Sequence, residues 1–309
     1  MRRNSKKWKI DQKDLIFYCL MMIWPVTQFL VFYIGVNINS FSLAFQKIDL
    51  VNQTTTWTFL GNFKNIFVRV APQNFWIMAK NSFLGWFVSL VVSVPLGLLF
   101  SYYIYKKMPF SGAFRAILFM PSIISSVVLA TLFRKFCDAA LPDILYDMFG
   151  YRLNSLFDPA YGSSRTFSVV IFYNIWIGFG TSVLMYSNAM AGIDPEIVES
   201  TRLDGAVGLR EFWHITLPLV YPTMSVFLMT GVANIFINQM NLYVLFDGSN
   251  ADWSLQTFGY YLYKETNVVG ESRAEYPHLA AFGLLLTFVA IPLTLGAKWL
   301  LGKCGPSEE

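Results

Sequence analysis

Residues 83–105, FLGWFVSLVVSVPLGLLFSYYIY, form an unbroken run without a charged side chain. A helix needs about 20 apolar residues to cross the hydrocarbon core of a bilayer, so this run predicts a membrane-spanning helix. Five further runs of this kind lie on either side of it. The sequence therefore predicts an all-α polytopic membrane protein with six transmembrane helices, at residues 15–38, 83–105, 113–133, 167–190, 219–246 and 279–300.

The composition of the chain supports this prediction. Of the 309 residues, 55% are hydrophobic and only 14% are charged, and the mean hydropathy is +0.47. Soluble domains carry roughly 25% charged residues, so an ordinary soluble fold is excluded. The net charge of +4 is too small, and the basic residues too dispersed, for a nucleic-acid partner. Two histidines and three separated cysteines predict neither a metal site nor a disulfide.

The distribution of Lys and Arg predicts the orientation in the membrane. The basic segment 1–14 precedes the first span and is expected to stay in the cytoplasm. Six spans then return the tail 301–309 to the same side. The density of Lys and Arg is about twofold higher in the predicted cytoplasmic segments than in the external ones. We expect both termini to be cytoplasmic, with one transmembrane domain over residues 15–300 and its core at about 78–300.

The predicted cytoplasmic loop 191–218 is long and polar, with helix signals of its own. Asp194 can cap free amides and is followed by a proline, which suits the first helical position. Gly205 interrupts the pattern, and a second helical repeat then runs to Pro218, where we expect the segment to end. The loop is predicted to form two short helices joined at a glycine. The apolar residues of the second repeat are Leu209, Phe212, Trp213 and Leu217.

The same loop resembles the EAA loop of ABC importer permeases. The family pattern, E-A-A-x-x-D-G-A followed by F-x-x-I-x-L-P, is matched in register, with Ser and Thr in place of the paired alanines. The residues at the motif positions are Glu199, Ser200, Thr201, Asp204, Gly205, Ala206, Phe212, Ile215, Leu217 and Pro218. The resemblance implies a MetI-like permease fold in a bacterial cytoplasmic (inner) membrane, in which this loop docks into a groove of the ATP-hydrolysing subunit.

Other segments resemble the sugar-importer branch, in particular the larger permease of the maltose type. They are Leu60–Phe63, Phe114–Pro121 and Tyr260–Tyr263, whereas Asp247–Asn250 stands where many sugar permeases have a G-G-P turn. The resemblance implies import of a carbohydrate, such as an oligosaccharide or glycan fragment, by alternating access. The implied partners are a second permease subunit, an ATP-binding cassette ATPase dimer, an extracytoplasmic solute-binding protein and membrane lipid. ATP and Mg would be used by the ATPase, and no cofactor is expected on this chain.

Polar residues within two predicted spans are candidates for the substrate pathway, because lipid cannot satisfy their hydrogen bonds. Asn234, Asn238 and Asn241 lie at i, i+4 and i+7, which predicts one face of a helix. Gln239 and Tyr243 flank this face, and the resemblance implies that this stretch contributes amides to a sugar site. The fourth span carries a second stripe, for which packing between helices is the competing interpretation. That stripe consists of Asn174, Gly178, Thr181, Met185 and Asn188.

The predicted spans lack the central charged residues with which ion-coupled transporters usually carry their coupling charge. Nor does the sequence contain a phosphate loop, because Gly296–Lys303 has the wrong spacing and is followed by a cysteine. We therefore expect a transport subunit without its own ATPase site, not an enzyme. The alternatives are a secondary transporter or channel for a polar solute, a membrane scaffold, and ABC import of a non-sugar solute.

Overall fold

The computed structural model describes residues 12–49, 52, 54–268 and 273–305. The basic residues Arg2 to Lys9 and the tail residues 306–309, which contribute to the predicted orientation, lie outside this part of the chain. The chain divides into two compact units. The first comprises Met1–Ile66 and Ser272–Leu284, and the second comprises Phe67–Glu271 and Leu285–Glu309.

The first unit contains a long apolar helical segment followed by a β-hairpin. The helical segment Lys13–Ala44 is long and apolar enough to cross a membrane and exceeds the predicted span at both ends. The Asn62 amide donates to the carbonyls of Ala44 and Gln46 at 2.8 and 2.7 Å, which ties the next helix to the hairpin. The elements are α1 (Gln12–Gln28), the π-helical η1 (Phe29–Gly35), α2 (Val36–Ala44), the antiparallel strands β1 (Gln46–Asp49) and β2 (Thr54–Trp57), the start of α3 (Gly61–Arg69), η8 (Arg273–Glu275) and the start of α14 (Tyr276–Cys304).

The second unit is helical throughout its regular structure. Its elements are α4 (Pro72–Tyr105), α5 (Ser111–Ile123), α6 (Ser126–Lys135), η2 (Phe136–Ala140), α7 (Leu141–Phe149), η3 (Pro159–Tyr161), α8 (Ser163–Ala191), α9 (Pro195–Leu203), α10 (Leu209–Glu211), η4 (Phe212–Thr216), α11 (Leu217–Ala233), η5 (Asn234–Phe236), α12 (Leu242–Leu245), η6 (Trp253–Leu255), α13 (Phe258–Val268) and the rest of α14.

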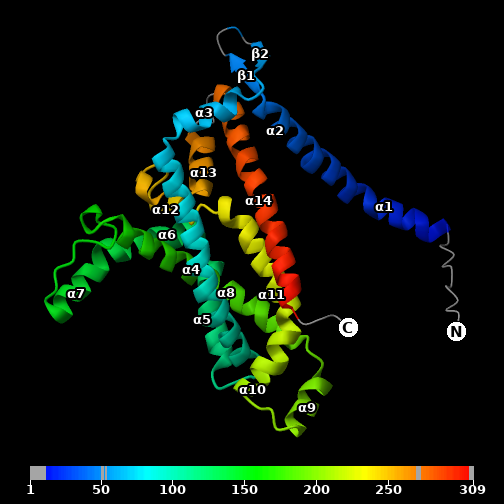
Figure 1. Cartoon of the computed structure of the whole chain (residues 1–309). Coiled ribbons are helices and arrows are strands. Elements are labelled where there is room, and N and C mark those ends of the chain that lie inside the picture. The colour runs from blue at the N-terminus through cyan, green and yellow to red at the C-terminus, as the bar shows by residue number, and fades with distance from the viewer. Residues whose placement is uncertain (1–11, 50–51, 53, 269–272, 306–309) are drawn as a thin grey trace. The chain divides into compact units, whose positions relative to one another are not determined.

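Helix α8 is the centre of the second unit and packs against both α4 and α5 (Figure 1). Gly180 allows the backbones of α8 and α5 to meet, because a Cβ atom at this position would overlap the carbonyl oxygen of Leu118. Two buried clusters stabilise the packing. One is built around Tyr102, Tyr186 and Phe212, and the other around Tyr173, Leu242 and Tyr260.

The described residues contain five helices that are long and apolar enough to cross a membrane, or six spans if one bent pair counts as a span. The predicted span at 113–133 is broken in the structure. Helix α5 ends at Ile123, and the next helical segment, Ser126–Phe149, is bent from it by 99°. Pro121 lacks an N–H donor, and Ile124 and Ser125 are extended, so the helical hydrogen bonds cannot continue across this point.

The predicted fifth span is displaced at both ends, because the helical segment runs from Leu209 to Phe236. Pro218 does not end a helix. The N–H of Leu217 bonds to the carbonyl of Phe212, five residues back, and this wide turn makes room for the proline ring. At the other end, Met240 and Asn241 have φ values of 52° and 53°, a left-handed conformation that a helix cannot contain.

Candidate functional site

The loop between α8 and α11 begins as predicted. Asp194 Oδ1 accepts the N–H of Glu196 at 3.0 Å, which confirms the helix start. In α9, Thr201 is buried, whereas Glu199 and Ser200 are exposed. Thr201 Oγ1 donates to the Ile197 carbonyl at 2.6 Å, so this hydroxyl is satisfied within its own helix. The small residues that replace the paired alanines of the motif therefore fit this helix without an unpaired polar group.

Two glycines shape the turn after α9. Gly205 and Gly208 have φ values of +76° and +64°, in the region that glycine adopts far more readily than other residues. The N–H of Ala206 bonds to the Thr201 carbonyl at 3.1 Å, which closes the helix end, and Asp204 lies exposed beside it. Gly205 was predicted as the turning point from the sequence, but the role of Gly208 was not.

Large apolar side chains surround this turn and are exposed. Leu203 is 90% exposed, and Val207, Leu209 and Trp213 are exposed to 59–66%. Several large exposed apolar side chains within one short loop are typical of a surface that contacts another protein. We call this set the loop surface; it consists of Leu203, Val207, Leu209 and Trp213.

The second half of the loop is fastened to the end of α4. Tyr102 Oη donates to the Gly208 carbonyl at 2.9 Å, and the ring of Phe212 lies 5.0 Å from the Tyr102 ring. Lys106 Nζ forms an ion pair with the buried carboxylate of Glu211. The motif residue Phe212 is thus a packing residue, whereas Ile215, Leu217 and Pro218 are half-buried. Lys106 and Glu211 carry no local sequence signal, because their pairing depends on a contact between residues 105 positions apart.

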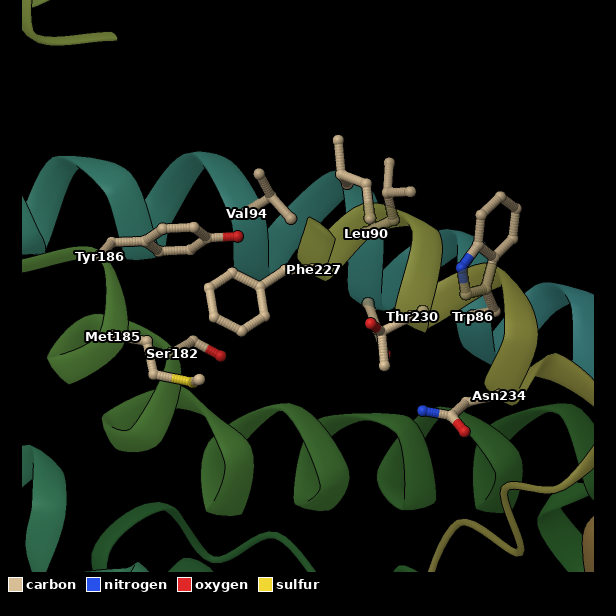
Figure 2. Close-up of a pocket in the computed structure, with 12 residues that line it drawn as sticks. Trp86, Leu90, Val94, Ser182, Met185, Tyr186, Phe227, Thr230 and Asn234 are labelled. Carbon is tan, nitrogen blue, oxygen red and sulfur yellow. The ribbon is translucent and has the colours of Figure 1, made fainter. Parts of the chain in front are cut away.

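A cavity of about 300 Å³ lies between α4, α8 and the α11–η5 segment (Figure 2). Trp86 lines it from α4, Ser182 and Tyr186 line it from α8, and Thr230 and Asn234 line it from the third wall. Hydroxyl and amide groups can exchange hydrogen bonds with a hydroxyl-rich ligand, while aromatic rings suit apolar faces. The spacing of Phe227, Thr230 and Asn234, at i, i+3 and i+7, was the signal in the sequence that could have identified this wall.

Among the residues predicted for the pathway, only Asn234 and Met185 line this cavity. The single helical face predicted for Asn234, Asn238 and Asn241 is wrong, because the helix ends at Phe236. Asn188 is exposed on α8, and the ring of Tyr243 lies 4.9 Å from that of Tyr263.

The remaining predicted amides hold the irregular segment that follows the helix. The Asn174 amide donates to the Met240 carbonyl, and the Asn241 amide donates to Asn174 Oδ1, both at 2.8 Å. Asn238 Oδ1 accepts the Met240 N–H at 2.8 Å. Gln239 Oε1 is buried and has no hydrogen-bond partner among the described residues. Asn174, Asn238 and Asn241 therefore replace the missing helical hydrogen bonds next to the cavity.

Comparison with known proteins agrees with this architecture. Residues 93–306 match the family described as binding-protein-dependent transport system inner membrane component. A probable ABC transporter permease protein of Mycoplasma pneumoniae is 30% identical over 174 residues, which cover 54% of this chain and 50% of that protein. The chain therefore spans about half the length of this relative.

Two longer matches cover nearly the whole chain. A polygalacturonan/rhamnogalacturonan transport system permease protein of Bacillus subtilis is 24% identical over 301 residues, which cover 93% of this chain and 88% of that protein. A chain of a bacterial ABC transporter involved in the import of alginate has the same fold, with a TM-score of 0.76 at 23% identity, and covers 97% of this chain and 99% of that chain. Because the family match extends over more than half of the sequence, the chain belongs to the binding-protein-dependent inner membrane components of ABC transporters.

Proposed function

We propose that this chain is the permease subunit of a bacterial ABC importer that moves a carbohydrate across the cytoplasmic membrane. The observation that carries the proposal is the exposed helix α9 with the adjacent loop surface, which offers a docking site to another protein. In the proposed assembly, an ATPase dimer binds this surface and hydrolyses ATP with Mg²⁺, so this chain needs no cofactor. A second permease and an extracytoplasmic solute-binding protein complete the importer, and both termini lie in the cytoplasm.

The contacts of the loop suggest how motion would reach the cavity. Segment α10–η4 is continuous with α11, and Glu211 and Gly208 are bonded to Lys106 and Tyr102 at the end of α4. Helices α4 and α11 are two of the three walls of the cavity. A displacement of the loop would therefore move two walls relative to α8, as alternating access requires. Glu199, Asp204 and Gly205 would transmit the movement of the ATPase.

The lining of the cavity supports a carbohydrate as the cargo. None of its 12 lining residues carries a charge, which favours neutral hydroxyl groups over carboxylates. The relative named for polygalacturonan and rhamnogalacturonan transport supports an oligosaccharide or glycan fragment as the cargo, and the uncharged lining favours one without the carboxylates of galacturonan. Asn234 would donate to and accept from ligand hydroxyls, and Trp86 would cover an apolar face of the sugar.

The proposal is tested by purifying the tagged chain from its native membrane and identifying the proteins that accompany it. We expect a second permease, an ATPase and a solute-binding protein, and ATP-dependent uptake of the sugar held by the binding protein in proteoliposomes. Recovery of this chain alone, with solute movement that needs no ATP, would replace the proposal with a secondary transporter or channel.

The role of the glycine turn is tested in the same vesicles. Gly205→Pro cannot keep a φ of +76°, so membrane insertion should persist while ATP hydrolysis no longer drives uptake. Gly192→Ala is the matched control, because Gly192 at the end of α8 has an ordinary helical φ of −81° and room for a methyl group. Normal uptake by the Gly205→Pro variant would contradict the coupling role of this loop.

A further inference from the structure

The helical segment Ser126–Phe149, made of α6, η2 and α7, has four distinct faces. The residues of each face recur about every fourth position along the segment. One face packs against the rest of the second unit through Phe133 and Cys137, and Leu129 on the same face is also buried. The next face holds polar residues that bond to neighbouring segments. The other two faces are exposed, and they differ sharply in chemistry.

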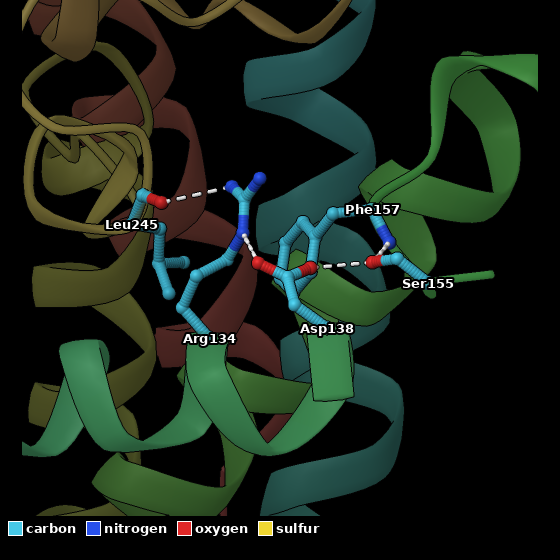
Figure 3. Close-up of polar contacts among 5 residues, drawn as sticks. All are labelled: Arg134, Asp138, Ser155, Phe157 and Leu245. Carbon is cyan, nitrogen blue, oxygen red and sulfur yellow. Dashed lines mark hydrogen bonds and ion pairs between the residues drawn. The ribbon is translucent and has the colours of Figure 1, made fainter. Parts of the chain in front are cut away.

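The bonded polar face fixes the rotation of the segment about its own axis (Figure 3). Arg134 Nε donates to Asp138 Oδ2 at 2.7 Å, and Arg134 Nη1 donates to the Leu245 carbonyl at 3.0 Å. Asp138 also accepts a hydrogen bond from the Ser155 hydroxyl. These bonds, together with the packing of Phe133, determine which side chains point away from the protein.

The first exposed face is apolar along its whole length. We call it the apolar stripe, and the exposure of its larger members is 45–69%. Every fourth residue of an α-helix drifts by about 40° around the axis, and the wide π-helical turn at η2 reduces this drift without cancelling it, so the line of residues winds gradually around the segment. The apolar stripe consists of Val128, Leu132, Phe136, Ala140, Ile144 and Met148.

The second exposed face is the polar stripe, which is rotated from the apolar stripe by about 100°. It includes one lysine and two aspartates, all exposed. An exposed apolar face beside an exposed charged face is typical of a helix that lies in a membrane–water interface. The polar stripe consists of Thr131, Lys135, Ala139, Asp143 and Asp147.

The contacts of α6 place it level with one edge of the apolar run of α4. The Phe133 ring lies 4.8 Å from that of Tyr173, and the adjacent Asn174 bonds to Met240. Met240 lies against Gly85, where a Cβ atom would come within 2.5 Å of its sulfur. Gly85 is near the start of the run 83–105, and the two residues just before the run, Asn81 and Ser82, bond to the backbone of the 254–258 segment. Helix α6 therefore lies near Gly85, where the charge-free run of α4 begins.

The direction of the segment agrees with this level. Helix α5 packs on α8, which is long and apolar enough to cross a membrane, and Ser126–Phe149 is bent from α5 by 99°, so the segment runs nearly at right angles to α5. Exposed apolar side chains of α5, among them Met120 at 56% and Ile123 at 72%, lead up to the bend, and the exposed Ser122, Ser125 and Ser126 lie between them and Val128, where the apolar stripe begins.

We propose that Ser126–Phe149 is an interfacial helix, with its apolar stripe on the acyl chains of the leaflet next to the start of the α4 run and its polar stripe in water. This segment would anchor the bend of the third span at a fixed depth. The proposal does not depend on the cargo or on coupling to an ATPase.

The test uses nitroxide labels on single cysteines in the full chain, with Cys19 and Cys304 changed to Ser and Cys137 to Ala. Labels at Leu132 and Ile144 report on the apolar stripe, and labels at Lys135 and Asp143 are the matched controls. The chain is placed in phosphatidylcholine nanodiscs, both alone and with its co-purified subunits. Collision with oxygen, which concentrates in lipid, should exceed collision with a water-soluble nickel chelate at the stripe, and this order should reverse at the controls.

Two results would overturn the proposal. Nickel collisions that dominate at Leu132 and Ile144 would show that the stripe lies in water. Exclusion of both reagents only when the other subunits are present would show that a protein partner covers it.

Two variants without spin labels, Ile144→Asp and Asp143→Asn, provide an independent check. Ile144→Asp should lower the thermal midpoint in nanodiscs, with a shift that grows as pH rises and the carboxylate ionises, whereas Asp143→Asn should leave the midpoint unchanged. Equal midpoints for the two variants would contradict the interfacial position.

Discussion

The fifth span is built differently at its two ends. At the loop end, the helix passes Pro218 through a π-helical turn, and its side chains are fastened to α4 by an ion pair and a tyrosine hydrogen bond. At the far end, the helix stops at Phe236, and amide side chains hold the backbone that follows. Thr257 Oγ1 adds a bond of 3.1 Å to the Asn238 carbonyl.

This difference indicates where the span is stiff and where it can rearrange. The loop end keeps its backbone hydrogen bonds within the helix, and its long-range contacts join it to α4 as one body. At the far end, each side-chain hydrogen bond contributes only about 1 kcal/mol, so exchange of these bonds is less costly than bending the helix. Motion that enters at the loop is therefore expected to be absorbed between Phe236 and Leu242, next to the cavity.

The largest effect is expected from breaking the ion pair at the loop end. Glu211→Ala leaves the Lys106 ammonium largely buried without its partner, and the loss of one member of a buried pair costs about 3 kcal/mol. The thermal midpoint of the purified chain should fall, and uptake per ATP hydrolysed should fall with it. The reversed pair, Lys106→Glu with Glu211→Lys, should recover part of both losses. If the single and the reversed variant have the same thermal midpoint and the same uptake per ATP, the ion pair between Lys106 and Glu211 does not join α4 to the loop.

A smaller loss of stability is expected at the far end. Asn174→Leu removes the donor to the Met240 carbonyl and the acceptor for Asn241, which should destabilise the fold by about 1–3 kcal/mol. Asn188→Leu is the control on the same helix, because this amide is exposed and its replacement should change little. Equal unfolding midpoints for the two variants would show that the amides do not hold this segment.

The sequence predicted those parts of the fold that depend on local signals. The apolar runs, the cap at Asp194 and the turn at Gly205 each follow from a few adjacent residues, and the structure contains the cap, the turn and five of the six runs as long helices. Hydropathy reports whether a segment suits lipid but not whether it is straight, which is why the bend after Ile123 was missed. Pro121 lies just before that bend, but Pro95, Pro222 and Pro292 lie within α4, α11 and α14, so a proline alone could not have predicted it.

The amides and charges of the candidate site were harder to interpret. Asparagines at i, i+4 and i+7 look the same whether they line a helix or cap a broken one, so the pattern alone could not separate these possibilities. The contact between Lys106 and Glu211 depends on how α4 and the loop pack. Both the role of the asparagines and the pairing of Lys106 with Glu211 depend on tertiary structure, which the local sequence does not report.

Variants at Asn238 test whether this amide supports the backbone or contacts the cargo. From the sequence, Asn238→Leu is expected to abolish or redirect uptake while assembly stays intact. The structure adds a loss of about 1 kcal/mol, because the Met240 N–H loses its acceptor. Asn238→Asp keeps that acceptor and should restore stability. If uptake is lost even in Asn238→Asp, whose stability is restored, the side chain contacts the cargo; if uptake recovers together with stability, the side chain supports the backbone.

The smallest effect is expected at Pro218, and it tests the continuity of the loop end directly. If the proline ended a helix, its replacement by alanine would extend that helix and stabilise it by up to about 3 kcal/mol. In the structure the helix already continues, with the proline in the first turn of α11 after the wide turn at Phe212–Thr216. Pro218→Ala should therefore change the free energy of unfolding by less than about 1 kcal/mol, because the wide turn already makes room for the proline ring and leaves no clash to relieve. A gain near the larger value would mean that the two halves of this segment are separate helices, and the stiff connection from the loop to the cavity would then have to pass through α4 alone.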